Sequence, residues 1–186
     1  AQGKTFYWSG VYENNMDNRR TLVTDLNVFE HFNLDLPESY RAVPNLFLGN
    51  IHPALQLHVL SQVRKPRFVL VDTMDLWINI ARHELVEVIS KVDMLTLNES
   101  EAKLLTDEHH LLDAAEHLLS MGPRYVMIKK GANGSILVER KGGVFILPAY
   151  PTRDVQDPTG AGDMFAGAFM GYLSTQPRIS TSALRR

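Results

Sequence analysis

The sequence contains no cysteine among its 186 residues, and this absence excludes disulfide bonds and thiolate metal sites. It also lacks an excess of charge of either sign, since 19 Lys and Arg residues are balanced by 21 Asp and Glu residues. Recognition of nucleic acid rests on a basic surface, which a net charge of -2 does not favour. We therefore expect a protein without a nucleic-acid partner.

Long hydrophobic runs are missing as well. The longest run of apolar residues and glycine, MFAGAFMGYL, has 10 residues, whereas a membrane-spanning helix needs about 20. The first residues, AQGKTFYWSG, have no apolar core of the kind found in a signal peptide. Together with the lack of cysteine, which fits a reducing compartment, these features predict a cytoplasmic protein with no membrane partner.

Short apolar segments alternate with helical patterns from about residue 45 onward. Alternation of strand and helix in units of this size is typical of a parallel sheet covered by helices. The continuous apolar character of the strands indicates burial on both faces of that sheet. The predicted fold class is therefore α/β. We expect strands at residues 45–49, 67–74, 93–98, 125–130, 134–140 and 143–150, and helices at residues 52–63, 83–92, 99–105, 111–122 and 160–175.

The N-terminal part of the chain has a different pattern. Residues 4–12, KTFYWSGVY, alternate and are rich in aromatic side chains, as a strand should be. A polar turn at residues 13–20 leads to a second strand candidate at residues 21–29. We expect a small β-hairpin in residues 1–30, attached to an α/β body in residues 31–186.

The start of the last predicted helix, in the stretch DPTGAGDMFAGAF, carries the clearest chemical signal. Gly160, Ala161 and Gly162 are small, so a ligand can approach the backbone there, and the first N–H groups of a helix bind anions. Asp163 has two interpretations. It is either an acid that stabilises the first turn through the helix dipole, or a general base beside an anion hole. Taken alone, these residues leave both interpretations open.

The whole stretch closely resembles the second signature of the ribokinase-like (PfkB) family of carbohydrate and nucleoside kinases. The matching positions are Asp157, Pro158, Thr159, Gly160, Ala161, Gly162, Asp163 and Phe165. The resemblance implies ATP-dependent phosphotransfer to a hydroxyl of a sugar or nucleoside. It also implies that Asp163 is the general base and that Gly160–Gly162 form the anion hole. In relatives that use a monovalent cation such as K⁺, the corresponding acid and threonine contribute ligands, which here are Asp157 and Thr159.

A second stretch, LNESEAKLL, has the Asn-x-x-Glu spacing of the same family at Asn98 and Glu101. Magnesium keeps several waters and contacts one or two carboxylates, so the resemblance implies that Glu101 holds a water of Mg-ATP. The same spacing is that of a capping box, in which Asn98 caps the helix and Glu101 reaches back to it. Both interpretations can hold together.

A third stretch, IKKGANGSILV, matches the short Gly-x-x-Gly turn that approaches the nucleotide in the family. The matching residues are Gly131 and Gly134, and Lys129 occupies the place of a side chain that reaches the phosphates in relatives. Side-chain alternation along the strand favours Lys129 over Lys130. The pair Asn133-Gly134 also predicts an ordinary hairpin turn, which is compatible with a place near the nucleotide.

The resemblance implies that the N-terminal hairpin is a β lid over the acceptor site. Its aromatic residues Phe6, Tyr7 and Trp8 would cover a substrate, support a homodimer through the lid, or pack on the body. Asn50, after the strand at residues 45–49, would point toward the sugar cleft.

The resemblance covers the lid, the Asn-x-x-Glu pair, the Gly-x-x-Gly turn and the signature helix, which is only part of the family's usual length. We therefore expect an incomplete chain that lacks an earlier acceptor-binding region and the later helices. Two alternatives follow. The chain is either a non-catalytic nucleotide-binding or assembly fragment, or it belongs to a kinase of a phosphorylated sugar. In the latter case, Arg19 and Arg20 would contact a second phosphate.

Overall fold

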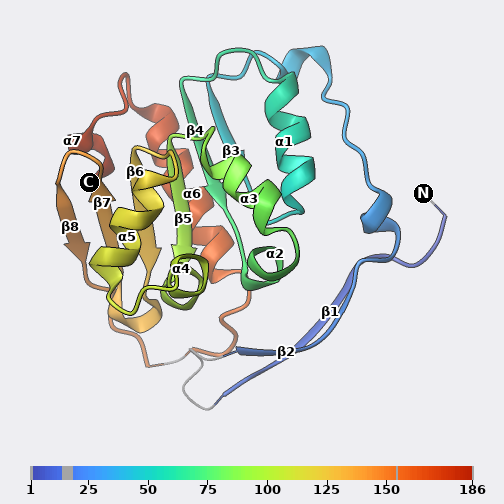
Figure 1. The fold of residues 1–186 in the computed structure, drawn as a ribbon, viewed down its shortest axis with the longest axis horizontal. Coiled ribbons are helices and arrows are strands. Elements are labelled where there is room, and N and C mark those ends of the chain that lie inside the picture. The colour runs from blue at the N-terminus through green and yellow to red at the C-terminus, as the bar shows by residue number, and fades with distance from the viewer. Residues whose placement is uncertain (1, 14–18, 154, 186) are drawn as a thin grey trace.

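In a computed structural model, which describes residues 2–13, 19–153 and 155–185, the chain forms one large and one small β-sheet (Figure 1). The large sheet has six strands in the order β3-β4-β5-β6-β7-β8, and the small one pairs β1 with β2. The strands of the large sheet are β3 (Asn45–Leu48), β4 (Phe68–Asp72), β5 (Met94–Asn98), β6 (Tyr125–Lys129), β7 (Ser135–Glu139) and β8 (Val144–Leu147).

The large sheet is parallel from β3 to β6 and antiparallel from β6 to β8. The change of direction has a local cause, because only a few residues join β6 to β7 and β7 to β8. A parallel connection needs a crossover of a dozen or more residues, whereas a short turn allows only a hairpin. The predicted hairpin at Asn133-Gly134 is confirmed, with a single 3-10 turn, η3 (Gly131–Asn133), at its tip.

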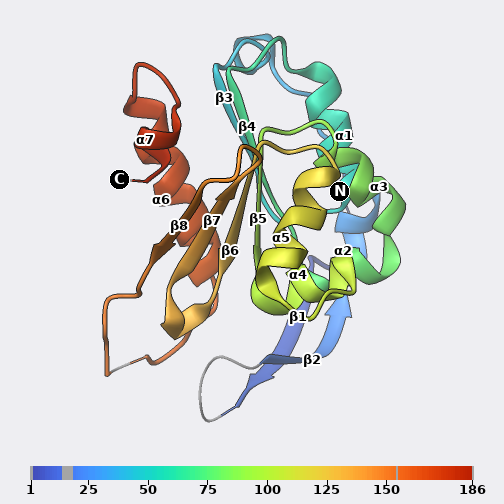
Figure 2. The same ribbon diagram turned by 60° about the vertical axis from the view of Figure 1, so that its left-hand side comes forward.

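The helices cover the sheet in two layers, which Figure 2 shows on its opposite sides. On one side lie α1 (Pro53–Gln62), α2 (Asp75–Ile80), α3 (Arg82–Ile89), α4 (Glu99–Thr106) and α5 (Leu111–Ser120), and on the other lie α6 (Ala161–Thr175) and α7 (Thr181–Leu184). The short helices α2 and α7 were not expected from the sequence. Among the residues that the structure describes, no helix is long and apolar enough to cross a membrane.

The core is divided by the sheet, as the alternation of side chains along each strand requires. On β4, Val69 and Val71 pack among the helices α1 to α5, whereas Phe68 and Leu70 pack toward α6. Both sets are buried, which explains why β4 is apolar throughout. The same expectation is wrong for β8: this edge strand has no neighbour on one side, and the side chains of Val144, Ile146 and Leu147 are exposed.

The N-terminal hairpin consists of β1 (Tyr7–Tyr12) and β2 (Arg19–Asp25), paired antiparallel with an irregularity between Ser9 and Gly10. Residues 14–18 of its predicted turn lie outside the described residues. Three boundaries differ from the prediction. The first strand begins at Tyr7 rather than at residue 4. Residues 19 and 20 belong to β2, and the second strand ends at Asp25, because the 3-10 helix η1 (Asn27–His31) follows it. A further 3-10 turn, η2 (Glu38–Tyr40), precedes β3.

Candidate active site

The carboxyl ends of the parallel strands and the start of α6 meet at one edge of the sheet, the lower edge in Figure 1. This edge brings together Asn50, which follows β3, and Asn98, Lys129 and Asp163 from β5, β6 and α6. Ligands of open α/β sheets bind at such an edge, because the loops that follow the strands converge there.

The start of α6 has the backbone shape that its small residues allow. Gly160 is the N-cap residue with φ +81°, a left-handed conformation that favours glycine. The N–H of Ala161 donates to the carbonyl of Pro158 at 3.0 Å, so the N–H groups that follow are the ones available to an anion. Asp163 lies in the first turn, and its side chain is exposed at the sheet edge.

The loop before α6 is tied to the lid. The backbone N–H of Thr159 donates to Asp157 Oδ1 at 2.8 Å, and Thr159 Oγ1 lies 3.1 Å from the hydroxyl of Tyr12 at the end of β1. Hydrogen bonds from the side chain and backbone of Thr159 lower the pKa of Asp157. In this arrangement, Asp157 and Thr159 are bonded to each other, and the lid rests on the signature loop.

Asn98 and Glu101 form the capping box that their spacing predicts. Asn98 Oδ1 accepts the N–H of Glu101 at 2.8 Å, and Glu101 Oε2 accepts the N–H of Asn98 at 2.7 Å. Glu101 is nearly buried, and this burial raises the pKa of its carboxyl group to about 7, against the opposing effect of the Asn98 hydrogen bond. The cap uses one oxygen of Glu101 and leaves Oε1 outside it.

The side chains at this edge fit a magnesium ion only if waters and the phosphates of a nucleotide supply most of its ligands. In the described ranges, no group of three or more His, Asp or Glu residues could hold a metal without other ligands. Magnesium, however, is often bound by one or two carboxylates, waters and the phosphates of a substrate. Glu101 Oε1 suits that role, so the residues present fit a metal that arrives with a nucleotide.

Lys129 forms an ion pair that the sequence did not reveal. Its Nζ lies 3.0 Å from both Oδ1 and Oδ2 of Asp72, the last residue of β4. Burial raises the pKa of Asp72, and the charge and hydrogen bonds of Lys129 oppose this effect. The ammonium also lies beside α6, because a Cβ atom added to Gly162 would be 3.2 Å from it. No motif marks Asp72, but its acidic type at the end of an apolar strand was a signal that could have been used.

The turn between β6 and β7 is closely packed. Its backbone closes through the N–H of Lys130, which donates to the carbonyl of Gly134 at 2.7 Å. Gly134 has φ +87°, and a Cβ atom there would lie 2.0 Å from the carbonyl oxygen of Leu147. Gly131 also adopts a positive φ, of +52°. Local geometry thus requires glycine at position 134, whatever binds beside the turn, whereas the φ of Gly131 is one that Asn27, Lys65 and Asp107 also adopt.

Asn50 is held in a defined orientation. The indole N–H of Trp77 donates to Asn50 Oδ1 at 2.8 Å, and Asn50 Nδ2 lies 3.0 Å from Met74 Sδ. Trp77, in α2, is buried, whereas Asn50 is exposed. The amide oxygen is therefore engaged by Trp77 and one N–H of the NH₂ group by Met74, which leaves the second N–H for a ligand.

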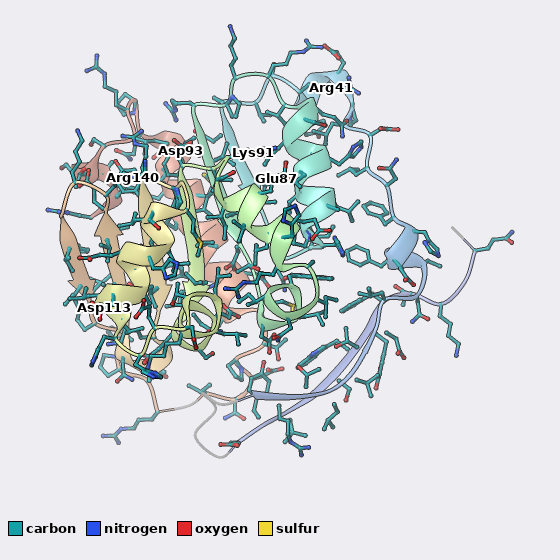
Figure 3. The ribbon with its side chains drawn as sticks, viewed as in Figure 1. Arg41, Glu87, Lys91, Asp93, Asp113 and Arg140 are labelled. Atoms are coloured by element: carbon teal, nitrogen blue, oxygen red, sulfur yellow. The ribbon has the colours of Figure 1, made fainter. Side chains whose placement is uncertain are left out.

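Glu87, Lys91 and Arg140 lie away from this edge, in the upper half of Figure 3, and make structural contacts. Glu87, in the last turn of α3, and Lys91, which follows the helix, form a surface ion pair at 2.6 Å. Arg140 donates to the carbonyls of Leu119 and Pro123, each at 2.9 Å, and so caps the end of α5. The Arg140 contacts tie the end of β7 to the end of α5, whereas the exposed Glu87–Lys91 pair is local.

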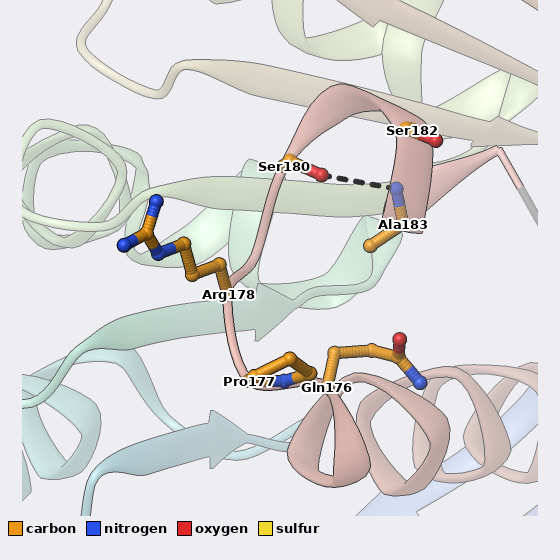
Figure 4. A pocket seen from close by; sticks show the side chains of 6 residues that line it. All are labelled: Gln176, Pro177, Arg178, Ser180, Ser182 and Ala183. Atoms are coloured by element: carbon orange, nitrogen blue, oxygen red, sulfur yellow. Dashed lines mark hydrogen bonds between the residues drawn. The ribbon is translucent and has the colours of Figure 1, made fainter.

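A cavity of about 290 Å³ lies between α6 and α7 (Figure 4). Gln176 and Pro177, which line the cavity, accept hydrogen bonds through their carbonyls from Arg67. Because Arg67 directly precedes β4, the cavity lies at the amino end of the strands. It is therefore separate from the candidate site. It is lined by Gln176, Pro177, Arg178, Ser180, Ser182 and Ala183.

A mostly parallel sheet with a small N-terminal β-hairpin and a glycine-rich helix start at its carboxyl edge is typical of ribokinase-like folds. Comparison with known proteins agrees with this class. The model of the pfkB family of carbohydrate kinases matches residues 51–185, and the chain belongs to that family.

Individual relatives are similar over parts of their length. A cytidine kinase of Thermococcus kodakarensis is 33% identical over 150 residues, which are 77% of this chain and 53% of that protein. The solved ribokinase of Arabidopsis thaliana, in complex with ribose and ATP, superposes with a TM-score of 0.73 at 20% identity, over 98% of this chain and 60% of that one. An E. coli protein solved with ATP and Mg²⁺ gives a TM-score of 0.55 at 24% identity, over 73% of this chain and 47% of that one. The chain thus covers 47% to 60% of the length of these three proteins.

Proposed function

We propose that this protein transfers a phosphoryl group from Mg-ATP to a hydroxyl group of a sugar or nucleoside. The observation that carries the proposal is the exposed carboxylate of Asp163 in the first turn of a helix that opens on Gly160. Membership of the pfkB family of carbohydrate kinases supports it. The cytidine kinase and the ribokinase among the similar proteins act on acceptors of these two classes.

In this proposal, Asp163 removes the proton of the attacking hydroxyl. The Asp163 carboxylate suits this step because it is exposed at the carboxyl edge of the sheet and next to backbone donors. The N–H groups at the start of α6, in the segment Gly160–Gly162 apart from that of Ala161, which is bonded to Pro158, stabilise the charge that develops on the transferred group. Phosphoryl transfer depends mainly on positioning and on neutralisation of charge, and this helix start can supply both.

The nucleotide would lie along the carboxyl edge between β5 and β7. Glu101 would hold a water of the magnesium ion, whose role is to neutralise the phosphates, while Asn98 keeps Glu101 in place through the capping box. Lys129 would contact the phosphates, and the turn from Gly131 to Gly134 would border the nucleotide. The E. coli neighbour solved with ATP and Mg²⁺ supports this choice of cofactors.

The acceptor would lie between the lid and Asn50. Because Trp77 holds the oxygen of the Asn50 amide, the NH₂ group would donate to an oxygen of the sugar. A monovalent cation such as K⁺ at Asp157 and Thr159 remains a prediction, and binding it would require these side chains to exchange their mutual hydrogen bonds for the ion.

The test is a coupled assay with Mg-ATP against a panel of sugars and nucleosides. We expect phosphotransfer by the wild type and a loss of at least about 100-fold in kcat for Asp163→Asn, with binding of ATP nearly unchanged. Asp113→Asn, an exposed position in α5, removes the same charge and serves as the control. Equal activity of Asp163→Asn and wild type would exclude Asp163 as the base.

A second candidate function is binding of nucleotide without turnover. It requires only the residues that fit Mg-ATP, such as Glu101 and Lys129, and no acceptor. A wild-type chain that binds ATP but phosphorylates no acceptor in the panel would establish this alternative.

A further inference from the structure

The ion pair between Lys129 and Asp72 is buried, which is an expensive arrangement. The side chain of Asp72 is 4% exposed and that of Lys129 is 16% exposed. Two charges removed from water lose hydration that their mutual attraction only partly restores, and apolar residues in such places often give equal or higher stability. The pair therefore calls for an explanation other than stability of the fold.

The pair reaches across the sheet. Asp72 ends β4 and pairs in register with Thr96 on β5, whereas Lys129 ends β6 and pairs with Asn98 on the other side of β5. The Lys129 side chain must therefore cross the intervening strand to meet Asp72. It does so on the face covered by α6, because Met127, two residues earlier on β6, packs in the α6 core.

This crossing brings the ammonium to the start of α6. A Cβ atom at Gly162 would lie 3.2 Å from Lys129 Nζ, and the side chain of Lys129 is the nearest group there. The charge of Asp163 also acts on the carboxyl group of Asp72. A positive charge thus lies beside the backbone donors at the helix start, where an anion would be bound.

The bonding of Lys129 leaves a donor for that anion. An ammonium group has three N–H donors. Its contacts of 3.0 Å to the two oxygens of Asp72 engage at most two of them and hold the group against the carboxylate. The remaining N–H can donate to a phosphate oxygen, and the long side chain loses little further conformational entropy because Asp72 already holds it. Donors that are already in position lower the barrier of a reaction in which charge develops.

We propose that Asp72 is a positioning residue that holds the Lys129 ammonium at the start of α6, where it meets the phosphate chain of the nucleotide during transfer. The proposal rests on the phosphotransfer proposed above. It assigns a role to Asp72, which lies outside the signature and the other matched motifs.

Kinetics distinguish positioning from other roles. Asp72→Asn should lower kcat on the order of 10- to 100-fold, because a reacting group misplaced by about 1 Å loses that much. The KM for ATP should not rise, since the variant also removes a carboxylate that repels phosphates. In the Lys129→Met background, Asp72→Asn should lower kcat little further, because the two residues act as a unit. The controls are Asp113→Asn and Lys141→Met, which remove the same charges at exposed positions.

A second variant keeps the test decisive if Asp72→Asn does not fold. Asp72→Glu retains the charge and moves the carboxylate by one methylene, so it should also lower kcat by about tenfold or more if position matters. Unchanged kcat in Asp72→Glu, fully additive losses in the double variant, or a raised KM with unchanged kcat would each overturn the proposal.

A measurement without turnover separates this proposal from the proposed function. In ¹⁵N NMR spectra of the wild type, Lys129 should give an ammonium signal that is protected from exchange by its two hydrogen bonds, and Lys129→Arg identifies it by its loss. Asp72→Asn should abolish this signal, and ATP, but not adenosine, should shift it in the wild type. A wild type without kinase activity would refute the proposed function alone, whereas a signal that survives Asp72→Asn or ignores ATP refutes the role of Asp72.

Discussion

The buried carboxyl group of Glu101 makes the stability of this protein depend on pH. Its pKa is about 7 in the folded chain, against an ordinary value of 4.5. Between these values, the folded chain retains a proton that the unfolded chain has released, so the free energy of unfolding falls as pH rises through this window. The contribution of protonated Glu101 to the free energy of unfolding is fully present below pH 4.5. It falls by about 3 kcal/mol in total, and this fall is complete above pH 7.

Glu101→Gln tests this because glutamine can keep the capping box and cannot ionise. In urea unfolding without magnesium, we expect the variant to match the wild type at pH 4.5 and to exceed its free energy of unfolding by about 2–3 kcal/mol at pH 8. Glu116→Gln, on the exposed side of α5, should show no such difference. Parallel pH profiles of Glu101→Gln and wild type would contradict the raised pKa.

Two glycines of α6 allow a matched comparison at the level of single residues. Alanine at Gly167 meets no atom within 4 Å, so Gly167→Ala should raise the free energy of unfolding by about 0.5–1 kcal/mol with unchanged activity. Alanine at Gly162 presses on Lys129 Nζ at 3.2 Å. Gly162→Ala should therefore gain less stability and lose phosphotransfer, as measured by unfolding and by the coupled assay. Identical behaviour of the two variants would show that the space beside Lys129 is not needed.

At the scale of elements, the hairpin of β6 and β7 depends on close contact with the end of β8. Gly134→Ala would place a Cβ atom 2.0 Å from a backbone oxygen of Leu147, so the strand must move, at a cost of about 3 kcal/mol or more. Gly142 has a similar φ of +89°, but alanine there meets nothing within 4 Å and costs only about 1 kcal/mol. Chemical unfolding of both variants measures the difference, and equal losses would contradict the close contact.

The sequence predicts most of the helices and strands of this fold. Every strand of the large sheet and the helices α1, α3, α4, α5 and α6 were expected near their observed places, because each has a clear apolar pattern. The helices α2 and α7, with 6 and 4 residues, are too short to show a helical period. Asp72 was missed for a different reason. Its partner Lys129 lies 57 residues away, and only the order and register of three strands bring the two together.

At the scale of the whole molecule, the lid presents apolar side chains to the solvent. Tyr7, Val11, Leu22 and Val23 on its strands are 54%, 44%, 49% and 40% exposed. We expect the wild type to form a homodimer through this surface, since exposed apolar strands favour association. Sedimentation velocity should show dimers for the wild type and monomers for Val11→Asp. Val144→Asp on β8, at a position that is 46% exposed, should remain dimeric, and a monomeric wild type would contradict the expectation.

The hydrogen bond between Tyr12 and Thr159 joins residues that are 147 positions apart. The whole central sheet lies between them in the chain. Closing so long a loop is unfavourable until the intervening residues have folded, because the entropy lost in the closure is recovered only by contacts made afterwards. The lid therefore docks late in folding. A chain emerging from the ribosome would carry an undocked hairpin until the signature loop has been synthesised and α6 has packed onto the sheet.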